Sequence, residues 1–82
     1  MTGTVTVRYF AAAAEAAGTD SEQVTATTAG ELRAAMTSTH GADLARVLTR
    51  CSLLADGVRL DTDDAPVPAG ATVDVLPPFA GG

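Results

Sequence analysis

Two segments near opposite ends of the chain alternate apolar and polar residues with a period of two. They are residues 4–10 (TVTVRYF) and residues 72–76 (TVDVL). In the first segment the positions that share one face are Val5, Val7 and Tyr9. Because successive side chains of a strand point to opposite faces of a sheet, this pattern predicts two half-buried strands. The two prolines that follow the second segment should end it, since proline has no amide hydrogen to donate.

Helix signals fill much of the sequence between these strands. Residues 11–17 (AAAAEAA) favour a short helix with a glycine stop after it. Thr28 and Glu31 have the spacing of a capping box, which predicts the start of a longer helix that ends at the His-Gly pair of residues 40–41. A second short helix is expected over residues 42–49.

A tight hairpin is predicted at Asp56-Gly57, which separates the apolar runs 52–55 and 58–60. Residues 22–27 give a further, weaker strand. The order of elements favours an α+β fold in which a mixed sheet of about five strands packs on a main helix. We expect the last strand to lie deep in that sheet.

Size and charge narrow the possible functions. The 82 residues suffice for one domain with a thin core, and a substrate pocket usually needs ~300 Å³, so an autonomous enzyme is disfavoured. The net charge is −5, and all five basic residues are arginines. Without a basic stripe, binding to nucleic acid or to an anionic membrane is not expected. The acidic balance fits either a basic protein partner or simple solubility.

Three other groups of reactive side chains give weak signals. Cys51 is the single cysteine, so it forms no intramolecular disulfide and with His40 cannot complete a zinc site. A sulfur-relay role for Cys51 is possible in principle, but a small buried apolar role is the better interpretation. The acidic residues 61–64 lack the spacing of a calcium loop and are read as solvated. No signal peptide or long apolar run is evident, so we expect a cytoplasmic protein.

The segment after the last strand, residues 77–82, reads PPFAGG. Its prolines stiffen the exit from the domain, and its glycines remove side chains from the last two positions. Fully extended, six residues reach roughly 20 Å. We therefore expect a domain over residues 1–76 and a flexible, extended tail over residues 77–82 that threads a narrow channel in another protein. Gly82 would present its carboxylate there, with Gly81 giving close backbone approach.

The chain resembles the ubiquitin-like sulfur carriers of the MoaD/ThiS family, and most of all the small subunit of molybdopterin synthase. The residues that carry this resemblance are VTVRYFA at 5–11, EAAG at 15–18, LADG at 54–57 and LPPFAGG at 76–82. The resemblance implies a β-grasp, ubiquitin-like fold. It also implies that the chain binds no cofactor and has no active site of its own.

The same resemblance implies a sequence of partners. An adenylating enzyme of the MoeB type would use MgATP to convert the Gly82 carboxylate into an acyl-adenylate, and a sulfur donor protein would then leave a thiocarboxylate. A large synthase subunit of the MoaE type, in a heterotetramer, would receive the tail. The thiocarboxylate would then donate sulfur to the pterin precursor of the molybdenum cofactor.

Other functions share this tail. A carrier for thiamine, cysteine or tRNA thiolation would use the same chemistry, and a ubiquitin-like modifier would be conjugated through Gly82 to lysines of its targets. A plain interaction module would not use its terminus at all. In each case the partner surface should include apolar residues that the small core cannot use. The candidates for this surface are Phe10, Leu60, Leu76, Pro77, Pro78, Phe79 and Ala80.

Overall fold

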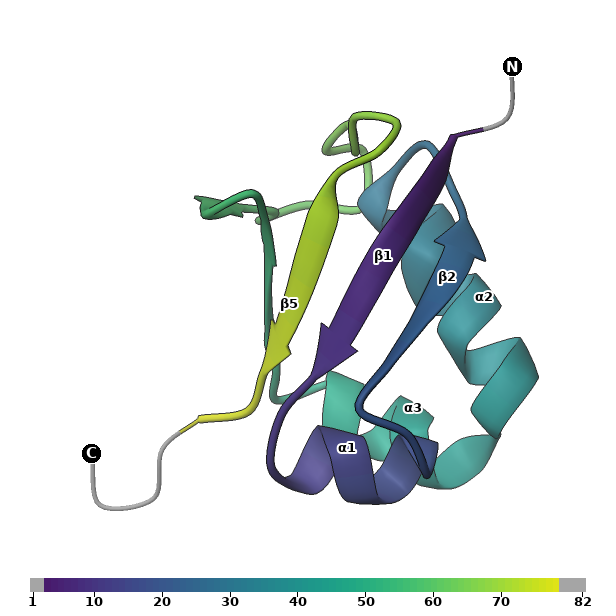
Figure 1. Ribbon diagram of the computed structural model, residues 1–82. Coiled ribbons are helices and arrows are strands. Elements are labelled where there is room, and N and C mark those ends of the chain that lie inside the picture. Colours follow the sequence, from purple (N-terminus) through teal and green to yellow (C-terminus); the bar gives the residue numbers. More distant parts are fainter. Residues whose placement is uncertain (1–2, 79–82) are drawn as a thin grey trace.

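The computed structural model describes residues 3–78 of the chain. Three helices and five strands are present in this part, and Figure 1 shows their arrangement. The strands are β1 (Thr4–Tyr9), β2 (Ser21–Thr25), β3 (Ser52–Ala55), β4 (Val58–Arg59) and β5 (Thr72–Leu76). The helices are α1 (Ala12–Ala17), α2 (Ala29–His40) and α3 (Ala42–Leu48). Within residues 3–78, no helix combines the length and the apolar character needed to cross a membrane.

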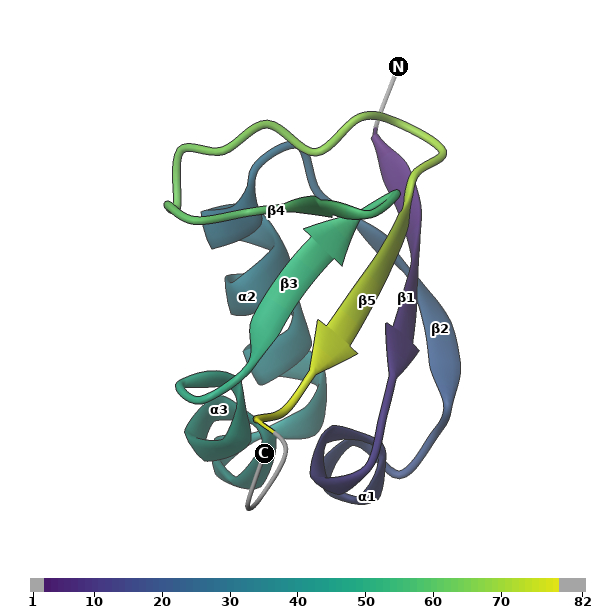
Figure 2. The same cartoon turned by 90° about the vertical axis from the view of Figure 1, so that its left-hand side faces the viewer.

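The strands form one mixed sheet in the order β2-β1-β5-β3-β4. Strands β1 and β5 are parallel, and the other neighbouring pairs are antiparallel. The predicted deep position of the last strand is confirmed, because β5 has a hydrogen-bonded neighbour on each side (Figure 2). The two strands with the clearest alternation in the sequence therefore form the centre of the sheet.

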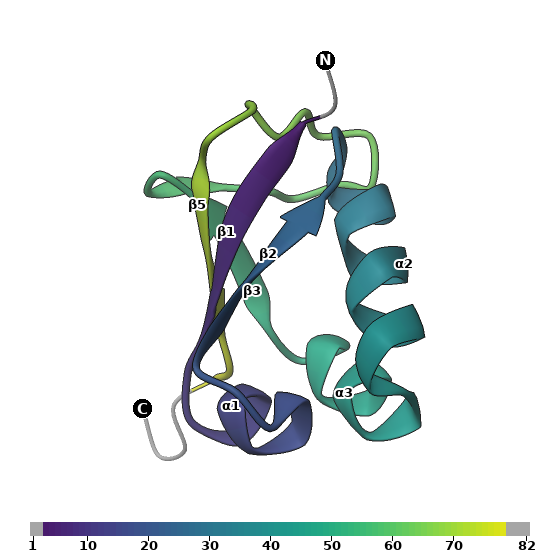
Figure 3. The ribbon, with the colours of Figure 1, turned by 45° about the vertical axis from the view of Figure 1, so that its right-hand side comes forward.

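One face of the sheet carries the core. Its side chains are buried and include Val5, Val7, Tyr9, Leu53, Ala55, Val73 and Val75. Helix α2 contributes Leu32 and Met36 to the same core, and all three helices lie toward this inner face or the lower end of the sheet (Figure 3). The alternation predicted for β1 and β5 is confirmed, and the opposite, outer face is left without a covering helix.

The local signals that set the element ends are also present. Gly18 adopts the left-handed conformation with φ 73°, and it ends α1. The Thr28 hydroxyl accepts a hydrogen bond from the amide of Glu31 at 3.2 Å, as a capping box requires. The Glu31 carboxylate reaches back one residue further than expected, to the amide and hydroxyl of Thr27 at 2.8 and 2.7 Å.

The hairpin turn is as predicted, with φ 48° at Asp56 and φ 85° at Gly57. The start of α1 differs from the prediction, because Ala11 is not helical. Its φ is 52° and its ψ is −125°, and the amide of Ala13 donates to the carbonyl of Phe10 at 3.0 Å. A tight turn therefore separates β1 from α1, and the helix begins at Ala12.

Candidate functional site

The part of the expected site that the structure describes is the end of β5 and the residues around it. Leu76 and Pro77 are half-buried, and Pro78 is exposed. The remaining tail residues named from the sequence, Phe79, Ala80, Gly81 and Gly82, lie outside the described residues. The chain thus leaves the sheet from its central region, at the lower end where α1 and α3 lie (Figures 1 and 2).

Phe10 lies on the outer face beside this exit. Its side chain is 38% exposed, and it follows directly after the pair formed by Tyr9 and Val75 in the parallel ladder. The next position of β5 is Leu76, which the alternation also places on the outer face. These two apolar side chains were predicted to belong to a partner surface, and the structure places them next to each other at the lower end of the two central strands.

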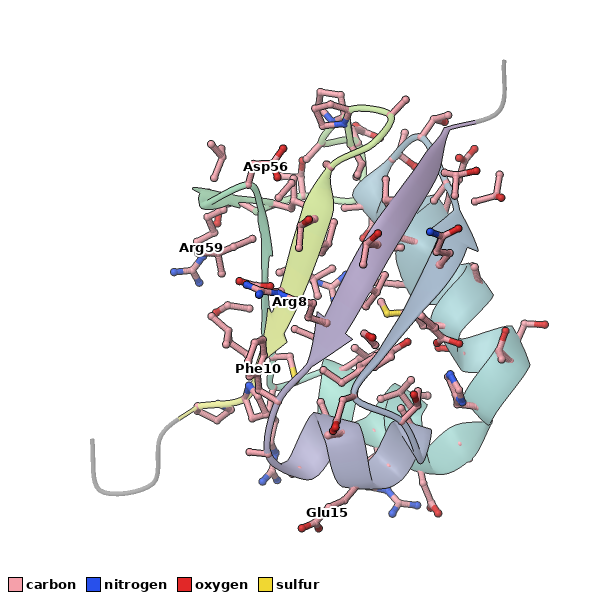
Figure 4. The ribbon with its side chains drawn as sticks, in the orientation of Figure 1. Arg8, Phe10, Glu15, Asp56 and Arg59 are labelled. Carbon is pink, nitrogen blue, oxygen red and sulfur yellow. The ribbon has the colours of Figure 1, made fainter. Side chains whose placement is uncertain are left out.

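An ion pair lies beside these two apolar side chains, between the same central strands. Arg8 donates from Nε and Nη2 to the two carboxylate oxygens of Asp74 at 2.7 and 2.9 Å. Its guanidinium carbon lies 5.6 Å from the centre of the Phe10 ring, and Figure 4 shows Arg8 and Phe10 on the same face. The hydrogen bond and the charge of Asp74 raise the pKa of Arg8. Sequence reasoning missed this pair, because the two residues are 66 positions apart.

Leu60 does not belong to the surface, so that prediction is wrong. Its side chain is only 6% exposed. The amide of Leu60 donates to the carbonyl of Leu53 at 2.8 Å, which extends the β3–β4 ladder by one step and turns Leu60 toward the inner face that Leu53 shares. The exposed apolar residue of this hairpin is instead Val58, at 67%.

A second feature that the sequence did not indicate is a hollow at the base of the tail. Its volume is about 210 Å³, and it is lined by Ala12, Val47, Arg50, Pro77 and Pro78. Ala12 opens α1, Val47 lies in the last turn of α3, and Arg50 follows that helix. Three distant segments form the hollow, so no spacing in the sequence could have revealed it.

The other polar groups considered from the sequence have structural partners. The Cys51 thiol donates to the carbonyl of Val47 at 3.2 Å, and burial raises its pKa, which disfavours the reactive thiolate. His40 contacts Glu22 and the Tyr9 ring. Among residues 3–78, no group of three or more histidine, cysteine and acidic side chains is placed to hold a metal ion. The acidic residues of the 61–64 loop are all exposed.

Taken together, the mixed sheet with parallel central strands and helices toward one face define the β-grasp fold of ubiquitin-like proteins. The chain belongs to the ThiS family, whose sequence profile matches residues 7–82. This is a family of ubiquitin-like sulfur carriers and modifiers. The fold class inferred from the resemblance is therefore confirmed, and so is the family.

Several solved structures share the fold. The crystal structure of SAMP1 from Haloferax volcanii is 26% identical, covers 98% of this chain and 100% of its own, and superposes with a TM-score of 0.81. The complex of subunits 1 and 2 of molybdopterin-converting factor from Helicobacter pylori contains a chain that is 25% identical to this protein. The match covers 96% of this chain and 99% of the other, with a TM-score of 0.72.

The solution structure of small archaeal modifier protein 1 (SAMP1) from Methanosarcina acetivorans has a TM-score of 0.84 over 100% of this chain and 99% of its own. At 20% identity it supports the fold alone. No curated protein sequence matches the chain.

Proposed function

We propose that this protein is a sulfur carrier that serves molybdopterin synthesis as the small subunit of molybdopterin synthase. The observation that carries the proposal is the position of β5. The central strand of the sheet leads from the core into Pro77 and Pro78, and the sequence then continues with Phe79-Ala80-Gly81-Gly82. The folded domain thus continues directly into a segment with two adjacent glycines. The molybdopterin-converting factor complex, which contains a chain of the same fold, supports this assignment.

The proposed chemistry uses Gly82 as the attachment point, with no catalytic group from the chain. A carboxylate is a poor electrophile, so an adenylating enzyme joins it to the AMP part of MgATP and releases pyrophosphate. A sulfur donor protein then supplies sulfur at the oxidation level of sulfide, which attacks the acyl carbon; the carbon–oxygen bond to AMP breaks, AMP leaves, and a thiocarboxylate remains on Gly82. Anionic sulfur is the reactive form of such groups. The reaction consumes ATP and is proposed to occur in the cytoplasm.

The large subunit of the synthase is the proposed acceptor of the charged tail. Phe10 and Leu76 would contact it beside the tail, because the exposed Phe10 and the half-buried Leu76 lie together on the outer face next to the exit of β5. In this assembly, a heterotetramer, Arg8 and Asp74 would lie at the border of the interface with their charges already paired. All acid and base groups for sulfur transfer would belong to the large subunit.

A second function, conjugation to other proteins through Gly82, is favoured by one observation. The chain is 26% identical to SAMP1 of Haloferax volcanii over nearly its whole length, and SAMP1 stands for small archaeal modifier protein 1. The same adenylate would then be attacked by a lysine amine of a target, which gives an isopeptide bond. Carriers for thiamine, cysteine or tRNA thiolation share the same first step.

Intact-mass measurement tests the first step. The chain is incubated with the adenylating enzyme, MgATP and a sulfur source, and we expect replacement of one oxygen by sulfur. A variant with one residue appended after Gly82 is the control and should stay unmodified. An unchanged mass in a preparation that loads an established carrier would refute the proposal. Capture of the large subunit by the loaded chain then favours the synthase, whereas lysine-linked adducts lost on deletion of Gly82 favour the modifier.

A further inference from the structure

The hollow at the base of the tail has the composition of a small docking site. Four of its five lining residues, Ala12, Val47, Pro77 and Pro78, are apolar, and the fifth is Arg50. Helices α1 and α3 pack against each other beside the point where β5 ends (Figure 2). The tail thus starts from the rim of an apolar depression that has one positive charge at its edge.

Arg50 differs from the other arginines in its surroundings. Each of the other four lies within ion-pair distance of a carboxylate: Arg8 with Asp74, Arg33 with Asp63, Arg46 with Asp43 and Arg59 with Asp61. Arg50 makes no ion pair with any residue of the described range 3–78, and it is exposed. In a chain with a net charge of −5, this guanidinium is a cation available to an external carboxylate.

We propose that this hollow docks the adenylating enzyme through an apolar side chain flanked by a carboxylate. The apolar side chain fills the depression between α1, α3 and Pro77, and the carboxylate pairs with Arg50. This inference rests on the proposed function, because it concerns the partner that activates Gly82. It adds a contact formed by Ala12, Val47, Arg50 and the two prolines to the outer-face contact proposed for Phe10 and Leu76.

The length of the tail supports this choice of occupant. The proposed attachment point, Gly82, is four residues beyond Pro78, and a fully extended segment of that length reaches at most ~14 Å. A protein that closes around the Gly82 carboxylate therefore also lies near the base of the tail, where Pro77 and Pro78 line the hollow. The contact would hold the domain while the tail enters the active site of the enzyme.

The test is the rate of adenylation as a function of carrier concentration. Arg50→Glu reverses the charge, and Ala12→Leu fills the hollow from an exposed position of α1. Each should raise the KM for the carrier about tenfold, as expected for the loss of one charge-assisted contact or one apolar contact, and leave kcat unchanged. The matched control is Arg46→Glu, the same charge change on the exposed face of α3, which should alter KM by about twofold or less.

Each outcome distinguishes this inference from the proposed function. If the parent chain is not adenylated at all, the proposed function fails. If the parent is adenylated and Arg50→Glu, Arg50→Gln and Ala12→Leu keep its KM, the docking inference alone is overturned. A lower KM in these variants would also overturn it, because it would indicate that the chain's own tail occupies the hollow. The melting temperature of each variant shows whether a raised KM instead reflects a loss of folded structure. The inference is supported if Arg50→Gln raises KM without lowering the melting temperature.

Discussion

At the scale of single residues, Ala11 is held in a backbone conformation that favours glycine. Its φ of 52° and ψ of −125° correspond to the first central position of a type II′ turn. The side chain of alanine is unfavourable there, and such strain costs of order 1–3 kcal/mol. The turn directs the chain from Phe10 on the outer face to α1 beneath the sheet, so the strained residue lies next to the proposed partner surface.

Replacement of Ala11 by glycine should therefore stabilise the protein. We expect Ala11→Gly to raise the free energy of unfolding by about 1 kcal/mol, because relief of strain exceeds the added freedom of glycine in the unfolded chain. Urea unfolding monitored by circular dichroism measures the change. Ala14→Gly is the matched control within α1, where the same exchange should lower stability by about 1 kcal/mol. An equal decrease in the free energy of unfolding in Ala11→Gly and Ala14→Gly would contradict the strain at Ala11.

Single residues also show where sequence reasoning succeeds and where it fails. Val7 and Val75 could be assigned to the core because alternation within one strand fixes the face of a side chain. Leu60 could not be assigned in this way, because its face depends on the extension of the hairpin ladder to Leu53. The run 58–60 is too short to establish its own alternation.

At the scale of elements, a polar cluster joins β1, β2 and the end of α2. The Tyr9 hydroxyl donates to Oε2 of Glu22 at 2.6 Å, and Nε2 of His40 lies 2.5 Å from the same oxygen. The rings of Tyr9 and His40 meet edge to face, with centroids 5.8 Å apart. Burial, followed by the hydrogen bond to Glu22, raises the pKa of Tyr9, so the phenol stays a donor. The cluster thus ties the C-terminal end of α2 to the sheet.

This cluster predicts a loss of stability in acid. Burial alone would raise the pKa of Glu22, but the hydrogen bonds from Tyr9 and His40 and the charge of His40 outweigh it and hold the pKa below the ordinary value of 4.5. A carboxyl group whose pKa is lower in the folded than in the unfolded state stabilises the fold. This stabilisation is fully present above the unfolded-state pKa and is lost as the pH falls through the folded-state pKa. We expect Glu22→Gln to lower the free energy of unfolding by about 1–3 kcal/mol at neutral pH.

The difference in the free energy of unfolding between the parent and Glu22→Gln should shrink as the pH falls below 4.5, which is the ordinary pKa of the carboxyl group. Urea unfolding at a series of pH values between neutral and acid measures it. Glu15→Gln, an exposed glutamate of α1, serves as the control and should show little effect at any pH. If Glu22→Gln were less stable than the parent by the same free energy of unfolding across the acid range, the pH dependence could not be assigned to this carboxylate.

Most element boundaries could be predicted from local signals, and the exceptions have a physical reason. The strand over residues 72–76 and the hairpin at Asp56-Gly57 match the structure, because alternation and turn chemistry are local properties. The first helix begins one residue later than predicted. The connection from β1 to α1 requires a turn at Ala11 in a conformation that alanine does not favour. Helix propensity could not reveal this.

At the scale of the whole molecule, the candidate site divides into two parts. The Gly81-Gly82 part lies outside the described residues and stays a prediction, which the sequence could supply because its signal lies in consecutive residues. The hollow around Arg50 and the Arg8–Asp74 pair could not be predicted in this way, because each combines residues from distant segments. Packing alone brings Ala12, Val47 and Pro77 together, so a hollow of this kind becomes visible only in the folded chain.

The side chains of this sequence include no amine that could accept an activated Gly82 from a second copy. The sequence contains no lysine, so the α-amino group is its only amine. The Cys51 thiol is half-buried and donates to a backbone carbonyl, and burial raises its pKa. The Tyr9 phenol is 3% exposed and donates to Glu22. If Gly82 is activated as proposed, the chain can act as an acyl donor, and its side chains offer a second copy only hydroxyls, which are weak nucleophiles without activation, and the half-buried Cys51 thiol.

We therefore predict that the activated protein does not link to itself through side chains. With the adenylating enzyme and MgATP but no sulfur source, and with the α-amino group acetylated, gel electrophoresis and intact-mass measurement should detect no covalent dimer. Arg59→Lys should form one, because this position is 68% exposed and the change introduces an amine while keeping the charge. Arg59→Gln is the control without an amine and should behave like the parent. Dimers of the acetylated parent would contradict the prediction, since a hydroxyl or the thiol would then have to accept the acyl group.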